Sequence, residues 1–294
     1  MACVIEIRDR ELYVLVGSGN HKKLKVQNAF RIFLQDSLFI NHDVNLNESM
    51  INYVKNALEE KGIKDKKVHL VINHRTILSK NLTVPKTDKK KLGFLVTNEM
   101  MTSFNLTRDF IVDYRVLNEL EVEGHKQYHV AASAMRRSSI EGLEIFFEGM
   151  GMKIQSIESA SNAFLNFVDK FDVVDNFDPV VVIDASSSYI RYFMFNHKNF
   201  MMMRSVLIHI DDDASVISKR VAHVLELLNQ SQQGITGKPI TKVIVVGYEK
   251  RFKFIEQISE QTLNIPSLVP DIFGSITPND IGLYDFTNSV GVLV

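Results

Sequence analysis

A buried strand that ends in a carboxylate is the feature that most constrains the fold of this chain. Residues 180–183 form a run of four β-branched apolar residues, and Asp184 follows them directly. Such a run is typical of a strand inside a sheet. The next residues are small or carry hydroxyl groups, which favours a turn. A strand tip of this kind can offer a carboxylate and backbone N–H groups to a phosphate and its metal ion.

The same arrangement occurs twice in the sequence. After the turn at 186–188, two further strands are predicted, over 189–195 and from residue 200 onward. The N-terminus repeats this plan, with an apolar run over 4–7 that carries Glu6. Two three-stranded meanders, each entered by a buried strand with an acid near its end, predict a duplicated α/β architecture.

The predicted elements divide the chain into two lobes and an insertion. We expect residues 1–75 and 153–177 to form the first lobe, residues 76–152 a small inserted α+β subdomain, and residues 178–294 the second lobe. Within the first lobe Asn47 is a predicted helix cap. In the second lobe, residues 231–239 are predicted to be a polar loop, and the tail from residue 266 to be irregular.

Composition excludes several classes of protein. At 294 residues the chain is long enough for two lobes, and its formal net charge of −1 argues against a dedicated nucleic-acid binder. The one cysteine, Cys3, cannot form an internal disulfide, which favours the reducing cytoplasm. No stretch approaches the length of an apolar membrane span, so direct membrane insertion is not expected.

Motifs of common catalytic sites are absent from the sequence. It contains no His-Glu-x-x-His zinc motif, no Gly-x-x-x-x-Gly-Lys phosphate loop and no Gly-x-Ser-x-Gly nucleophile motif. Three acids at 211–213 precede a predicted helix, where carboxylates are favoured as caps, and a cation site is the alternative. The basic run at 86–91 is interpreted as the solvated start of a helix. No catalytic residue is assigned.

Several longer segments carry a family resemblance that spans essentially the whole chain. They are VIEIRDRELYVL, NLTVP, VDYRVL, VAASAMRRSSIEGLEIFFEGMGMKIQSIESASNAFLN, VVIDASSSYIRYF, VIVVGYEKRF and TNSVGVLV. Together they resemble the actin-like ATPase superfamily and, within it, the PilM family of type IV pilus assembly proteins, which is similar to the division protein FtsA. The resemblance implies a two-lobed actin-like (ribonuclease H-like) fold with an α+β insertion in the first lobe.

The resemblance also implies ATP and Mg²⁺ as ligands. The cofactor-binding positions that it indicates are Glu6, Arg8, Asp9, Arg10, Asp184, Ser186, Ser187, Ser188, Gly247 and Tyr248, with Asp184 also as the metal residue. Family members usually carry Asp-Ile-Gly at both phosphate turns and paired glycines at the adenosine turn. Here Arg8, Ser186 and Tyr248 replace those glycines, so side chains stand where phosphate or adenine would lie. We therefore expect a degenerate nucleotide site that binds ATP weakly or not at all.

The two arginines near the first turn leave two interpretations open. Arg8 and Arg10 either lie on a solvated hairpin, which we expect, or contact phosphate as guanidinium forks.

The function implied by the resemblance is a cytoplasmic scaffold. Such a protein would be held at the inner face of the membrane by the N-terminal tail of a PilN-like membrane protein, with the pilus motor ATPase as a further partner. The candidate partner-binding residues are Arg136, Arg137, Asp113 and Arg115. Two alternatives stay open: an actin-like ATPase that cycles or polymerises, and a small-molecule kinase of the same superfold.

Overall fold

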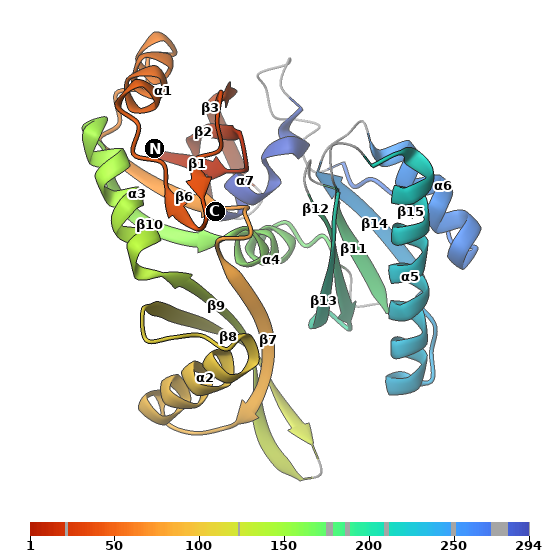
Figure 1. The fold of residues 1–294 in the computed structure, drawn as a ribbon. Coiled ribbons are helices and arrows are strands. Elements are labelled where there is room, and N and C mark those ends of the chain that lie inside the picture. Colours follow the sequence, from red (N-terminus) through yellow and green to blue (C-terminus); the bar gives the residue numbers. More distant parts are fainter. Residues whose placement is uncertain are drawn as a thin grey trace. The chain divides into compact units, whose positions relative to one another are not determined.

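The chain forms two compact units, shown in Figure 1. The computed structural model describes residues 1–20, 23–122, 124–174, 179–185, 189–208, 212–247, 251–271 and 282–293. Unit 1 contains Met1–Asn166 together with Asn288–Val294, and unit 2 contains Phe167–Thr287. This division differs from the sequence-based one in two places. Unit 2 begins at Phe167, whereas the first lobe was expected to extend to residue 177, and the C-terminus belongs to unit 1. The last residues lie with unit 1, because they pack on and bond to its first strands.

The main sheet of unit 1 has five strands in the order β10-β6-β1-β2-β3. Strands β1, β2 and β3 form an antiparallel meander, and β6 and β10 continue the sheet in parallel with β1. The strands are β1 (Ala2–Ile7), β2 (Glu11–Asn20), β3 (Lys23–Phe33), β6 (Lys67–Ile72) and β10 (Lys153–Ser159). A small hairpin of β4 (Phe39–Ile40) and β5 (Asp43–Val44) follows the meander.

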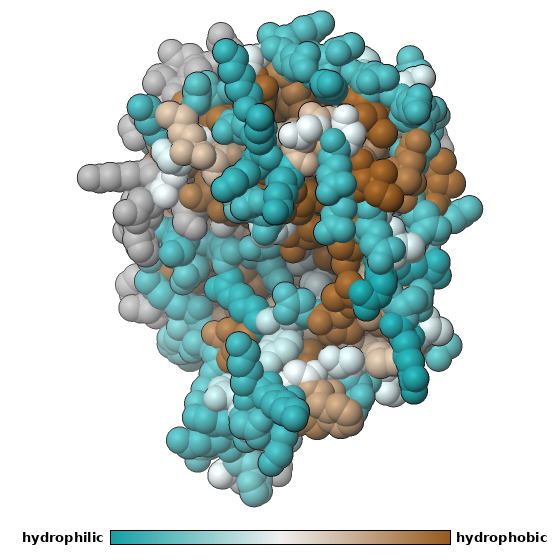
Figure 2. Space-filling model, turned by 90° about the vertical axis from the view of Figure 1, so that its left-hand side faces the viewer, coloured by the Kyte–Doolittle hydropathy of each residue, from teal (hydrophilic) through white to brown (hydrophobic). Residues whose placement is uncertain are grey.

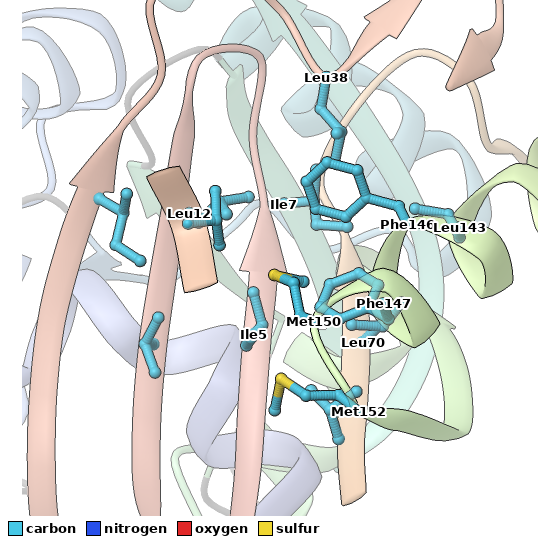
Figure 3. Packing of buried hydrophobic residues seen from close by; sticks show 14 of the residues in the cluster. Ile5, Ile7, Leu12, Leu38, Leu70, Leu143, Phe146, Phe147, Met150 and Met152 are labelled. Atoms are coloured by element: carbon cyan, nitrogen blue, oxygen red, sulfur yellow. The ribbon is translucent and has the colours of Figure 1, made fainter. Parts of the chain in front are cut away.

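Two helices pack with one face of this sheet to form the core of unit 1. Helix α1 (Glu48–Glu60) begins at Asn47, whose side chain caps Ser49 N at 2.8 Å, and α3 (Arg137–Gly149) packs beside it. Figure 3 shows Phe146 of α3 beside Ile7 of β1, and Phe147 beside Leu70 of β6. These four side chains are fully buried, and each contributes about 1.5–3 kcal/mol of apolar burial.

The approach of α3 to the β4–β5 hairpin requires a residue without a side chain. A Cβ at Gly142 would lie 2.9 Å from Val44 Cβ, so only glycine lets the helix pack this closely. Ser138 Oγ also donates to Asp43 Oδ1 at 2.8 Å, and Ser139 Oγ donates to the His42 carbonyl.

The inserted segment of unit 1 is a three-stranded antiparallel sheet with one helix. Its strands, in the order β7-β9-β8, are β7 (Leu78–Pro85), β9 (His125–Arg136) and β8 (Phe110–Val122). Helix α2 (Lys89–Phe104) covers one face of this sheet, and the two share a core separate from that of the main sheet. Strands β8 and β9 stay paired as far as Val122 and His125. Cross-strand charges, such as Glu121 opposite Lys126, support this polar extension.

Unit 2 repeats the strand plan of unit 1, as the duplicated sequence pattern predicts. Its sheet has the order β13-β12-β11-β14-β15, with an antiparallel meander followed by parallel strands. The strands are β11 (Val180–Ala185), β12 (Tyr189–Asn196), β13 (Asn199–Leu207), β14 (Lys242–Gly247) and β15 (Ser267–Leu268). Helices α5 (Ala214–Thr236) and α6 (Phe252–Leu263) pack on each other and contribute to its core.

Two sequence-based expectations about helix ends are wrong. The predicted loop over 231–239 is helical as far as Thr236, because the buried Gln232 donates to Thr236 Oγ1 at 2.8 Å and keeps the last turn intact. The predicted irregular tail contains the 3₁₀ helix η2 (Leu283–Phe286) and helix α7 (Thr287–Leu293). Helix α4 (Ala160–Lys170) follows β10, and the chain passes from unit 1 to unit 2 within it.

Candidate functional site

The carboxylate of Glu6 lies at the centre of a buried polar cluster in unit 1. Glu6 is fully buried, and its Oε1 atom accepts three hydrogen bonds. The donors are Arg8 Nε at 2.8 Å, Asn73 Nδ2 at 2.6 Å and Asn288 Nδ2 at 3.1 Å. The cluster joins β1 to the residue after β6 and to α7, so it unites three distant parts of the sequence.

The electrostatics of this cluster keep Glu6 ionised. Burial on its own raises the pKa of the carboxyl group. The charge of Arg8 and the hydrogen bonds from Arg8, Asn73 and Asn288 outweigh burial and hold the pKa below its ordinary value. A buried anion with a matched cation therefore occupies the tip of the first strand.

Arg8 is the clearest correction to the sequence analysis. We expected a solvated hairpin, but only 3% of Arg8 is exposed, and its guanidinium carbon lies 3.6 Å above the centroid of the Tyr13 ring. The ion pair with Glu6 and this cation–π contact account for its burial. Asp9 and Arg10 are exposed, in agreement with the expectation for the rest of this turn.

The second acidic strand tip, in unit 2, has its own buried arginine. Asp184 is 1% exposed, and its Oδ2 atom accepts a hydrogen bond from Arg191 Nη1 at 2.9 Å. Arg191 lies directly opposite Asp184 in the β11–β12 register. Gly247 approaches the same carboxylate from β14, where an added Cβ would meet Asp184 Oδ1 at 2.8 Å. Gly247 therefore allows close contact between strands at this point.

The carboxylates at these two strand tips are already bonded within the chain. Mg²⁺ is bound through carboxylates that are free to face the ion or its waters. Here each carboxylate is buried and bonded to a guanidinium, whose positive charge opposes a second cation. The predicted residues Ser186, Ser187, Ser188 and Tyr248 lie outside the described residues. Among those described, no group of three or more His, Cys, Asp or Glu side chains could hold a metal ion.

Two of the four predicted partner-binding residues lie together on the inserted sheet. Apolar side chains at alternating positions of β7, β8 and β9 pack toward α2. The residues between them point to the other side of the sheet. We call this second side the polar face. It consists of Ser79, Asn81, Thr83, Asp113, Arg115, His129, Ala131 and Ser133.

The polar face adjoins the end of the main sheet of unit 1. Arg115 Nη1 donates a hydrogen bond to Asn166 Oδ1 of α4, and Ser79 Oγ lies 3.1 Å from Ser133 Oγ. Glu158 of β10 is half-buried, and its burial raises its pKa. Arg115 lowers this pKa and Asp113 raises it, which places all three charges in one neighbourhood.

The other two predicted residues are not part of the polar face. Arg136 pairs in register with Phe110, lies over its ring at 5.6 Å, and has Nε 4.0 Å from Asp109 Oδ2. Phe110 packs with the α2 core. Its partner Arg136 therefore lies on the side of the sheet that faces α2, opposite the polar face. Arg137 is the exposed first residue of α3. The four predicted partner-binding residues therefore do not form one site: two lie on the polar face and two lie elsewhere.

Sequence reasoning did not identify the partners of these charges. Arg191 could have been found from the β11–β12 hairpin, since register places it opposite Asp184. Asn288 gives no local signal, because it lies 282 residues from the carboxylate it bonds. Glu158 and Asn166 become visible as neighbours of Arg115 only once β10 and α4 are in place.

No family model and no curated protein matches the sequence. A solved chain of a PilM-PilN type IV pilus biogenesis complex superposes with a TM-score of 0.78 at 14% identity, covering 99% of this chain and 97% of that chain. The chain has the actin-like fold in its PilM-like form.

Two more distant structures agree on the fold. A protein with an actin-like ATPase fold and unknown function from Bacteroides thetaiotaomicron gives a TM-score of 0.54 at 10% identity, over 99% of this chain and 95% of that one. The ethanolamine utilization protein EutJ from Carboxydothermus hydrogenoformans gives 0.51 at 9% identity, over 99% and 88%. The two-lobed actin-like fold predicted from the sequence is confirmed.

Proposed function

We propose that this chain is an actin-like scaffold of type IV pilus assembly that binds the N-terminal cytoplasmic tail of a PilN-like inner-membrane protein. The observation that carries the proposal is the PilM-like fold over nearly the full length of both chains. A fold alone does not fix a function, so the proposal also needs a suitable surface and an account of the nucleotide site.

The polar face of the inserted sheet is the surface we assign to the tail. Its small, partly exposed side chains, such as Ser79 and Ser133, let another backbone approach closely. Asp113 and Arg115 provide charges of both signs for polar groups of a peptide. Strand β10, which ends beside this face at Glu158, is the edge strand of the main sheet, and an edge strand can pair with an extended segment.

A degenerate nucleotide site forms the second part of the proposal. The ion pairs Glu6–Arg8 and Asp184–Arg191 satisfy within the chain the charges that nucleotide and Mg²⁺ would otherwise use. Breaking either pair would leave a buried charge without its partner, which typically costs about 3–5 kcal/mol. The acids therefore act in folding, and the scaffold role needs no nucleotide.

Attachment to the membrane would come from the partner. None of the helices in the described ranges is long and apolar enough to cross a bilayer. In the proposal the tail of the PilN-like protein holds this chain at the cytoplasmic face of the membrane. Contact with the pilus motor ATPase stays a prediction, with no residues assigned to it.

The experiment that tests the function is a titration of the tail with purified protein. A fluorescently labelled tail peptide is followed by anisotropy, with and without ATP and Mg²⁺. We expect binding in the micromolar range that is insensitive to nucleotide. Absence of binding, together with ATP turnover by the protein alone, would favour the actin-like ATPase or kinase instead.

A further inference from the structure

Helix α2 carries its positive charges at an unfavourable end. Lys89, Lys90 and Lys91 occupy its first turn, are exposed, and have no acid within that turn. The N-terminus of a helix is the positive end of its dipole, so lysines there are repelled by the helix itself. Lys91 lies 3.7 Å from Asp88 with 76% of its side chain exposed, whereas Lys89 and Lys90 make no salt bridge to a described residue.

A large aromatic side chain stands next to these lysines. Phe94 is 66% exposed. It lies three and four residues after Lys91 and Lys90, so the three side chains share one side of the helix. The surface is a basic patch with an apolar centre, and we call it the basic face of α2.

Helix α3 shows the opposite pattern. Glu141, Glu144 and Glu148 are exposed at spacings of three and four residues, and the last turn contains no basic residue. Like charges at this spacing repel, and acids toward the C-terminus of a helix oppose its dipole. Within the described residues none of the three forms a salt bridge. Ile145, 53% exposed, lies among them, and together they form the acidic face of α3.

The two faces do not neutralise each other within one chain. Helix α2 packs on β7, β8 and β9, while α3 packs on β5, β9, β10 and α1. Figure 2 shows the side of unit 1 on which these helices lie. Hydrophilic side chains cover much of this side, and a hydrophobic region runs between them. The charged side chains of both faces are exposed.

We propose that the basic face of α2 docks on the acidic face of α3 of a second copy of this chain. An antiparallel arrangement sets Phe94 beside Ile145 and brings Lys90 and Lys91 opposite Glu148. It also aligns the positive end of one helix dipole with the negative end of the other. Because the two faces differ, the contact is heterologous and adds copies head to tail.

We assign a second copy of this chain as the binding partner, because the basic face and the acidic face that complement each other both lie on this chain. The basic face has three lysines beside Asp88, and the acidic face has three glutamates beside Arg137. Each face therefore has an excess of one charge around one exposed apolar residue, and the other face balances that excess. An anionic membrane would match α2 alone and leave the acidic face of α3 unexplained. The contact uses few apolar atoms and exposed charges, so the association is weak and sensitive to salt. It is independent of the tail-binding proposal.

The test is sedimentation velocity of the full chain over a range of concentrations at low and high salt. The acidic variant carries Lys90→Glu and Lys91→Glu, and the basic variant carries Glu144→Lys and Glu148→Lys. Each relieves the unfavourable charge–dipole interaction of its own helix, so both variants should fold. We expect concentration-dependent association of the unchanged protein at low salt, weakened about tenfold or more in either variant because like charges then face each other.

Mixing the two variants gives the decisive result. In the mixture, α2 of the acidic variant can dock on α3 of the basic variant. The unchanged α2 of the basic variant can dock on the unchanged α3 of the acidic variant, so association should return. A control with Glu59→Lys and Glu60→Lys, in the last turn of α1, makes the charge change of the basic variant elsewhere and should associate normally. A protein that stays monomeric at every concentration, or a mixture that fails to reassociate, overturns the proposal.

Discussion

Asn288 Nδ2 donates a hydrogen bond to Glu6 Oε1 at 3.1 Å, and both residues are buried. This bond ties the last helix of the chain to its first strand. Leu293 of the same helix lies beside Gly17 of β2, so α7 packs along the meander of unit 1. The C-terminal segment therefore completes the polar cluster around Glu6 and is part of the stability of unit 1.

Replacing Asn288 with alanine should destabilise unit 1 by about 1–3 kcal/mol, because a donor to a buried charge is lost. The urea midpoint measures this loss. Asn56→Ala, on the exposed side of α1, is the matched control and should change stability by no more than about 0.5 kcal/mol. Equal midpoints for the two variants would show that the bond to Glu6 contributes nothing.

Removing Arg8 should be more damaging. Arg8→Met leaves the buried Glu6 without its cation, and we expect a loss of about 3–5 kcal/mol in the free energy of unfolding. The double variant with Glu6→Gln removes both charges and should recover part of that loss. If the double variant is as unstable as the sum of the single variants, the two groups are not coupled as the structure indicates.

His74 should make unit 1 sensitive to mild acid. Burial lowers the pKa of His74 to about 4, from 6.5, and its Nδ1 atom accepts from Thr76 N at 3.2 Å. The unfolded chain then binds the proton more readily than the folded chain. Stability is therefore complete above pH 6.5 and falls as the pH drops through about 4. The ring is partly exposed, so solvent screening keeps the total loss below the roughly 3 kcal/mol that the pKa difference alone implies.

The measurement is the urea midpoint of the protein and of His74→Gln at several pH values in this window. The variant should have a flatter pH dependence, whatever its stability at neutral pH. Charges around the ring are Asp9, Arg75 and His42, and none of them is altered by the substitution. Parallel pH profiles for the two proteins would assign the acid sensitivity to other groups.

Local chemistry was predictable from the sequence, and long-range pairing was not. The caps Asn47 and Asp213 were predicted correctly, because a cap depends on residues within one turn. Arg8 was placed wrongly, since its burial depends on Tyr13 and on a carboxylate that points away from the apolar core. Helix α7 was missed because its seven residues become helical by packing on a sheet formed at the other end of the chain.

ATP with Mg²⁺ should leave the melting temperature unchanged. A ligand present at a hundred times its Kd would add about 2.7 kcal/mol of stability, which a thermal scan detects easily. The ion pairs at Glu6 and Asp184 predict no such shift at millimolar ATP. A clear increase in melting temperature that disappears in Asp184→Asn would show a working nucleotide site.

Docking of the tail on the polar face is the central proposal, and the anisotropy titration with three single variants tests it most directly. Arg115→Glu reverses a charge on that face, Arg136→Glu does so on the opposite side of the same sheet, and Arg108→Glu does so at an exposed position before β8. We expect Arg115→Glu to weaken tail binding by about tenfold or more, and the other two to bind as the unchanged protein does. Equal binding by all three variants, or loss of binding in Arg136→Glu alone, would contradict the account.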